Sequence, residues 1–76
     1  MENSDNLFIG NNIRKWRIMK GFKQFQFAKH IDISTTTLSK IENGQQKVNL
    51  PRLQQIAEGL KIKTTQLFKD PSDWLP

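Results

Sequence analysis

Residues Gln24–Asn43 read QFQFAKHIDISTTTLSKIEN and are the most informative stretch of the 76-residue chain. Apolar residues recur at helical spacing on both sides of the short segment 32–34. They are Phe27, Ala28 and Ile31 before the segment and Leu38 and Ile41 after it, with Ile33 in between. Because Ala28 is small, two helices can cross there closely at a steep angle. The stretch therefore predicts a helix over about 24–31, a tight turn, and a second helix over about 35–43.

Local signals support this turn. Asp32 tolerates a positive φ better than most non-glycine residues, and Ser34 is a suitable N-cap for the second helix. Asn43 and Gly44 end that helix. Lys23 falls at the N-cap of the first helix, where it offers no side-chain acceptor and adds a cation to the positive helix end. A bound phosphate would offset both penalties, although an imperfect cap that the fold tolerates is an equally good explanation.

An N-terminal helix is predicted over about 8–19, because Ile9, Ile13 and Trp16 recur at i, i+4 and i+7. Gly21 suits the left-handed position that follows its end. The aromatic side chains fall at inward spacings, so we expect them in the core rather than as platforms for stacked bases. This set comprises Trp16, Phe22, Phe27 and Phe68.

Two further helices complete the predicted fold. Asn49 caps the first, which has Pro51 in its first turn, and a short last helix covers about 64–68. The first of these should bury Leu50, Leu53, Ile56, Ala57 and Leu60. The fold class is thus all-α, a compact bundle of five short helices. The domain division is a flexible N-terminus (1–7), a helix-turn-helix domain (8–70) and a turn-like C-terminal tail (71–76) that carries the apolar pair Trp74-Leu75.

The charge is positive and unevenly placed. The formal net charge is +5, and six lysines and arginines fall within residues 14–30, where the helix-turn-helix begins. Attraction to DNA phosphates would favour this placement, although many small basic proteins carry lysines that are only solvated.

Several classes of function are excluded by what the sequence lacks. There is no cysteine and a single histidine, His30, so disulfides and cysteine-ligated zinc are excluded. No Ser, His and Asp have catalytic spacing, and no glycine-rich phosphate loop or metal-binding loop occurs. No apolar run approaches a membrane span. We therefore expect a cytoplasmic protein that is not an enzyme and needs no metal or cofactor.

The chain resembles the phage repressor and Cro family of helix-turn-helix proteins, also called the XRE family, from about Ile9 to Phe68. The matching residues are Ile9-Gly10, Arg17, Gly21, Gln24, Phe27-Ala28, Ile31, Ser34, Thr37-Leu38-Ser39, Ile41-Glu42-Asn43-Gly44, Ile56-Ala57, Leu60 and Leu67-Phe68. The chain departs from the family pattern at Lys23, Asp32 and Lys61, which are cap or turn positions. It also departs at Phe25, where the family usually has a polar or acidic residue, so an exposed phenyl ring is expected there.

The resemblance implies that Thr35, Thr36 and Lys40 reach base edges from the second helix of the motif. A threonine hydroxyl can donate or accept, its methyl group can touch a thymine methyl, and a lysine can reach guanine O6 and N7. The alternative is a polar face that only meets solvent.

The same resemblance implies contacts to the DNA backbone and one structural ion pair. Gln24 would contact the backbone and buttress the second helix of the motif. Arg17 and Glu42 would form a partly buried salt bridge that fixes geometry more than it adds stability. The other expected backbone contacts, each of which could equally be a cap, turn or surface residue, are Lys23, Thr37, Asn43, Gln45 and Lys47.

The function implied is sequence-specific binding of double-stranded DNA to regulate transcription, in association with the nucleoid. We expect a homodimer on a palindromic operator, with half-sites roughly 34 Å apart. The dimer contact is expected from the last two helices and Trp74-Leu75. A phage-type repressor, a restriction-modification controller and an antitoxin remain open, with the small single-domain size slightly favouring the controller. The alternative is a protein-binding adaptor or antitoxin, which exposed Phe25, Ile18, Trp74 or Leu75 would favour.

Overall fold

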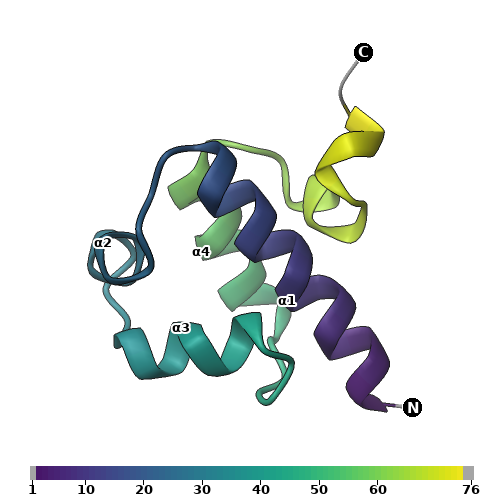
Figure 1. The fold of residues 1–76 in the computed structure, drawn as a ribbon, viewed down its shortest axis with the longest axis horizontal. Helices are drawn as coiled ribbons and strands as arrows, with labels where there is room; N and C mark the ends of the chain where they lie inside the picture. Colours follow the sequence, from purple (N-terminus) through teal and green to yellow (C-terminus); the bar gives the residue numbers. More distant parts are fainter. Residues whose placement is uncertain (1, 75–76) are drawn as a thin grey trace.

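The computed structural model describes residues 2–74 as four α-helices followed by two short 3-10 helices, with no strand in that range (Figure 1). The all-α helix-turn-helix fold predicted from the sequence is confirmed, with four α-helices rather than five. The α-helices are α1 (Glu2–Met19), α2 (Gln24–His30), α3 (Thr35–Glu42) and α4 (Leu50–Leu60), and the 3-10 helices are η1 (Thr64–Phe68) and η2 (Pro71–Trp74).

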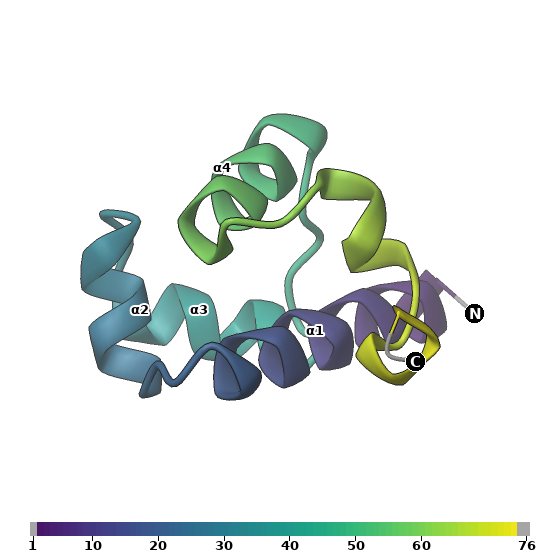
Figure 2. The same cartoon turned by 90° about the horizontal axis from the view of Figure 1, so that it is seen from above.

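The helices surround one core. In Figure 2, α4 lies on one side of the molecule and α1 with α3 on the other, while α2 closes one end and η1 with η2 the opposite end. The buried apolar residues come from all four α-helices, the end of α2 and η1: Ile13, Trp16, Phe27, Ala28, Ile31, Leu38, Ile41, Leu53, Ile56, Ala57, Leu60 and Leu67.

α1 begins at Glu2, six residues before the predicted start at residue 8, so residues 2–7 are helical. The first turns of α1 pack on the loop after α3, since a Cβ atom added to Gly44 would lie only 2.8 Å from Leu7 Cα. This contact joins residues far apart in the sequence, so the periodicity of residues 8–19 could not reveal it.

The predicted fifth α-helix is the 3-10 helix η1. Pro71 disfavours the helical conformation at Asp70, and Lys69 is already extended at φ −132° and ψ 152°. The short run that remains suits a 3-10 helix. The tail expected to be turn-like contains the second 3-10 helix, η2, which ends at Trp74; Leu75 and Pro76 lie outside the described residues.

Two residues expected in the core are exposed. Phe68 is 45% exposed and Leu50 is 57% exposed. Successive residues of a 3-10 helix point about 120° apart, so η1 turns Leu67 inward and Phe68 outward. Leu50 is the first residue of α4, and the buried stripe of that helix starts one turn later, at Leu53.

α1 and α3 meet through their backbones at Gly10. A Cβ atom at Gly10 would lie 2.2 Å from the carbonyl oxygen of Ile41 and 2.8 Å from that of Glu42. Only glycine permits such an approach, and the contact fixes the end of α3 on α1.

Two side-chain hydrogen bonds hold η1 against α1. Asn12 Nδ2 donates to the carbonyl oxygen of Leu67 at 3.0 Å, and Trp16 Nε1 donates to that of Gln66 at 3.2 Å. Because Asn12 is buried, its amide would be costly to leave without a partner. These bonds place η1 on α1 at a position that apolar packing alone would leave loosely defined.

Candidate nucleic-acid interface

α2 and α3 form the helix-turn-helix, with α3 crossing the end of α2 at a steep angle (Figure 1). Asp32 has a φ of +61°, the left-handed conformation expected in this turn. The N–H of Ile33 donates to the carbonyl oxygen of Ala28 at 2.9 Å and closes the end of α2. Both helices agree with their predicted bounds to within one residue, because turn and cap signals are local.

The start of α3 is fixed by its cap. Ser34 Oγ accepts from the N–H of Thr37 at 3.0 Å and donates to Thr37 Oγ1 at 2.7 Å. The start of α2 has no such cap: Lys23 makes no side-chain cap hydrogen bond, and its own N–H donates instead to Gln26 Oε1 at 3.0 Å. The amides in the first turn of α2 therefore lack a side-chain acceptor, as the sequence predicted.

Thr35, Thr36 and Lys40 lie together on the exposed side of α3. Thr36 and Lys40 are four positions apart and share one face of α3, and Thr35, also exposed, lies beside that face at the start of the helix. Within residues 2–74 their side chains make no hydrogen bond, so their donors and acceptors are available to a ligand. We call these three residues the recognition face.

The other residues expected to contact the DNA backbone lie in α3 or in the segments next to α2 and α3. Thr37 is half-buried and its hydroxyl accepts the Ser34 bond, so it is less available than its neighbours. Asn43 is the C-cap of α3, with Nδ2 3.4 Å from Ser39 Oγ. Lys23, Gln45 and Lys47 are exposed in the segments that flank α2 and α3.

Arg17 and Glu42 form a buried bidentate ion pair. Arg17 Nε lies 2.7 Å from Glu42 Oε2, Nη2 lies 3.1 Å from Oε1, and Nη1 donates to the carbonyl oxygen of Phe22 at 2.8 Å. The two side chains are 9% and 2% exposed. The pair ties α3 to α1 and neutralises the one carboxylate of α3.

Gln24 completes this network from α2. Its Nε2 donates to Glu42 Oε1 at 3.1 Å, and because the carboxylate can only accept, the amide orientation is fixed. The second amide hydrogen of Gln24 remains as a donor to a ligand. Three helices thus meet at Glu42, so the recognition face is held on a rigid support.

A family comparison adds independent evidence. Residues 13–67 match the HTH_3 helix-turn-helix family. The chain belongs to this family.

Three similar proteins illustrate the range of the HTH_3 family. The chain is 41% identical over 63 residues to the control protein C.MunI of Mycoplasma sp, covering 82% of this chain and 85% of that protein. It is 36% identical over 58 residues to the uncharacterised transcriptional regulator YazB of Bacillus subtilis, covering 76% and 84%. The crystal structure of the restriction-modification controller C.AhdI from Aeromonas hydrophila superposes with a TM-score of 0.83 at 27% identity, covering 87% and 96%.

HTH_3 proteins are DNA-binding regulators of transcription, so this chain is a regulator rather than an enzyme. In the part of the chain from residue 2 to residue 74, no helix is long and apolar enough to cross a membrane. In the same range, no three histidine or acidic side chains are placed to hold a metal ion.

The structure also contains supports that the sequence did not reveal. Gln55 Nε2 donates to the carbonyl oxygen of Ile31, and Arg52 Nη1 donates to Gln55 Oε1 at 3.2 Å. These bonds join α4 to the end of α2, just before the turn. A glutamine on a helix surface carries no pattern that would have singled it out.

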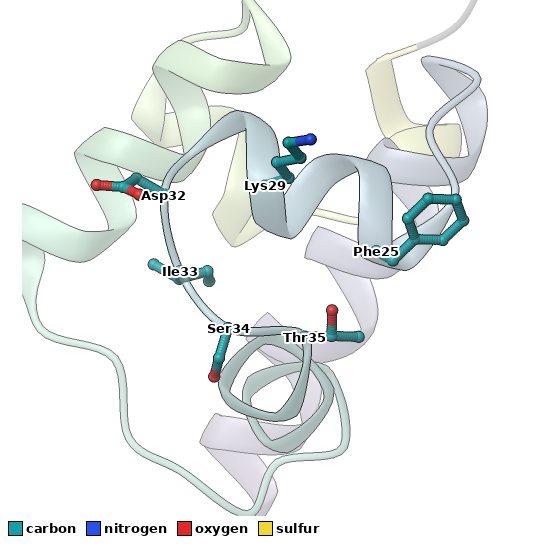
Figure 3. Close-up of a pocket in the computed structure, with 6 residues that line it drawn as sticks. All are labelled: Phe25, Lys29, Asp32, Ile33, Ser34 and Thr35. Carbon is teal, nitrogen blue, oxygen red and sulfur yellow. The ribbon is translucent and has the colours of Figure 1, made fainter.

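An open hollow of about 540 Å³ lies between α2 and the start of α3 (Figure 3). Phe25, in the first turn of α2, is 59% exposed, as expected from the resemblance. The hollow is lined by Phe25, Lys29, Asp32, Ile33, Ser34 and Thr35. Since Thr35 belongs to both, the hollow is continuous with the recognition face.

Proposed function

We propose that this HTH_3 protein binds an inverted-repeat operator in double-stranded DNA as a homodimer and regulates transcription from it. The observation that carries the proposal is the recognition face, whose free hydroxyl and ammonium groups stand on a helix held by the Arg17–Glu42 pair. A protein with this function acts in the cytoplasm, on the nucleoid.

The recognition face has the chemistry to read base pairs. Thr35 and Thr36 each offer a hydroxyl that donates or accepts and a methyl group that fits a thymine methyl. Lys40, one turn further along α3, offers an ammonium to guanine O6 and N7. Positioning contacts to phosphates would come from the residues around this face: Lys23, Gln24, Thr37, Asn43, Gln45 and Lys47.

Exposed apolar residues outside the helix-turn-helix support dimerisation. Leu7 and Phe8 are 45% and 50% exposed on α1, Leu50 is 57% exposed on α4, and Phe68 is 45% exposed on η1. In Figure 2, η1 and the N-terminal part of α1 lie at the end away from α2, whereas α4 lies along one side of the molecule. Leu50 and Phe68 belong to the region that the sequence predicted for the dimer contact.

A dimer also meets an energetic requirement. A single domain of this size makes few base contacts, so tight specific binding needs a second half-site. A two-fold dimer would place two copies of α3 in successive major grooves, roughly 34 Å apart. The operator should then be an inverted repeat.

Among HTH_3 functions we favour control of a restriction-modification system. C.MunI, which is called a control protein, is 41% identical over most of both chains. C.AhdI, a restriction-modification controller, shares the fold over 96% of its length. A phage-type repressor and an antitoxin are the other candidates of the same fold.

Selection of bound sequences from a random duplex library, at physiological salt and with the full chain, tests the proposal. Enrichment of an inverted repeat is the expected result, and it would supply the operator. Weak binding without a consensus, lost steeply as salt rises, would mean that only phosphates are read and would overturn the proposal.

A second candidate function is binding of a protein partner. Ile18 and Met19, at 56% and 48% exposure on the outer side of α1, line an open hollow of about 320 Å³ against Pro71 and Ser72 of η2. This surface is separate from the hollow that contains Phe25, so the two do not form one patch.

A further inference from the structure

Phe25 is exposed beyond what the fold requires. Its ring is 59% exposed, and it contributes nothing to the core, which on α2 uses Phe27 and Ala28. Exposing a phenyl ring to water costs free energy, and burying the ring against a partner recovers that free energy. Phe25 is therefore a candidate contact for a ligand.

Continuity with the recognition face indicates the ligand. Phe25 and Thr35 line the same hollow, and Figure 3 shows both on one side of it while Asp32 lies at the other end. A DNA strand that meets Thr35 would thus pass Phe25 and avoid the carboxylate of Asp32, which would repel phosphates. Lys23 and Lys29, both exposed, stand two residues before Phe25 and four residues after it.

The chemistry of the strand fits this arrangement. A DNA backbone alternates anionic phosphates with deoxyribose rings, whose C–H faces are apolar. Lysines suit the phosphates, and a phenyl ring suits the sugar between them. A polar or acidic side chain, which the family usually has at this position, would offer no such apolar contact.

We propose that Phe25 packs on a deoxyribose ring of the operator strand at the outer edge of α3 and so positions the recognition face. The proposal rests on the DNA-binding function proposed above. Phe25 acts through the placement of α3 and reads no base itself. Its contribution to binding is apolar, whereas that of Lys23 and Lys29 is ionic.

Equilibrium binding across a salt series tests this with the selected operator and an unrelated duplex. Phe25→Ala is expected to weaken binding to both by about tenfold, the size of effect that uncovering part of an aromatic ring produces. The slope of log K against log salt should not change, because no phosphate contact is lost. Phe25→Leu, which keeps an apolar side chain, should restore most of the affinity, and Lys23→Ala should lower the slope by about one.

Three outcomes would overturn the proposal. Unchanged affinity in Phe25→Ala would mean that DNA does not cover the ring. A changed slope would mean that the substitution disturbed a phosphate contact. A loss that appears only on sequences with thymine at one position, and that vanishes when uracil replaces it, would assign Phe25 to a thymine methyl.

The melting temperature of Phe25→Ala serves as the folding control. Because Phe25 is exposed, this temperature should be unchanged. Failure of the wild-type chain to select any operator is a separate result, which concerns the proposed function instead.

Discussion

Arg17 and Glu42 make a buried, two-point ion pair that joins the end of α3 to α1, with Nε 2.7 Å from Oε2. The carboxylate also accepts from Gln24 of α2. Removing one partner would leave a buried charge without compensation, which costs more than the pair contributes.

Glu42→Ala should therefore lower the free energy of unfolding by about 3 kcal/mol. At about 4–8 °C per kcal/mol for a domain of this size, the melting temperature should fall by more than 10 °C. Thermal unfolding followed by circular dichroism measures this. The double variant Arg17→Met/Glu42→Leu, which removes both charges, should lose much less. An unchanged melting temperature for Glu42→Ala would disprove the structural role of the pair.

Gly10→Ala tests the backbone contact between α1 and α3. Helix propensity favours alanine by roughly 0.5–1 kcal/mol, but its Cβ would meet the Ile41 carbonyl oxygen at 2.2 Å. We expect the clash to win and to destabilise the fold by about 1–3 kcal/mol. Asn11→Ala, at the exposed neighbouring position, is the matched control and should stay within about 0.5 kcal/mol of the parent. Equal stability of both variants would contradict the close approach.

Lys40→Ala should relax base preference at one position of each half-site. The proposed contact to guanine, if lost, would remove about 1–3 kcal/mol of discrimination against the wrong base. Binding to single-base operator variants measures it. Lys63→Ala, an exposed lysine just before η1, is the control and should keep the full base preference. If Lys40→Ala weakens binding equally on every sequence, Lys40 contacts a phosphate instead.

Leu50→Glu tests the proposed dimer surface. A charge on this exposed side chain should prevent apolar association while leaving the fold of each chain intact. Sedimentation equilibrium should show a shift toward monomer, and operator affinity should fall with it. If the variant still forms a dimer at the same concentration, the dimer interface does not include Leu50. The hollow beside Ile18 would then be the next candidate for the interface.

Asp70 gives a pH dependence with a defined sign. The Lys15 ammonium and hydrogen bonds from Ser72 lower the pKa of Asp70 from 3.8 to about 2. A lowered pKa in the folded state stabilises the fold above the unfolded pKa, and this stabilisation is lost as pH falls from about 4 through about 2. Asp70→Asn should thus melt at a lower temperature than the parent at pH 7, and this difference should become much smaller as pH falls to about 2. A difference that is as large at pH 2 as at pH 7 would mean that the charge is not its cause.

The helix-turn-helix could be predicted closely because its signals are local. Ser34, Asp32 and the apolar positions of α2 and α3 each act within a few residues, and the structure agrees with their predicted bounds to within one residue. The start of α1 could not be predicted, since it depends on packing between Leu7 and Gly44. The outward turn of Phe68 depends on how η1 packs on α1, where Asn12 and Trp16 bond to the carbonyl oxygens of Leu67 and Gln66, and these contacts join distant residues.

The candidate site also combines residues that could be assigned from the sequence with contacts that could not. Thr35, Thr36 and Lys40 were assigned as base contacts from their positions in the family motif, and this assignment stays a prediction. Only some of the residues that hold the recognition face in place could be predicted from the sequence. Arg17 and Glu42 were implied by family resemblance, whereas the bonds from Gln55 to Ile31 and from Asn12 to Leu67 join distant residues without any sequence pattern.

The packing of Leu7 on Gly44 has a practical consequence for protein engineering. It brings the first turns of α1 against the loop between α3 and α4, which carries Gln45 and Lys47. An affinity tag or fluorescent protein fused to the N-terminus as an extension of α1 would lie beside the loop that is proposed to contact the DNA. Such a fusion would weaken operator binding by obstruction alone, so labels for binding experiments belong on a side chain such as Lys63, near η1.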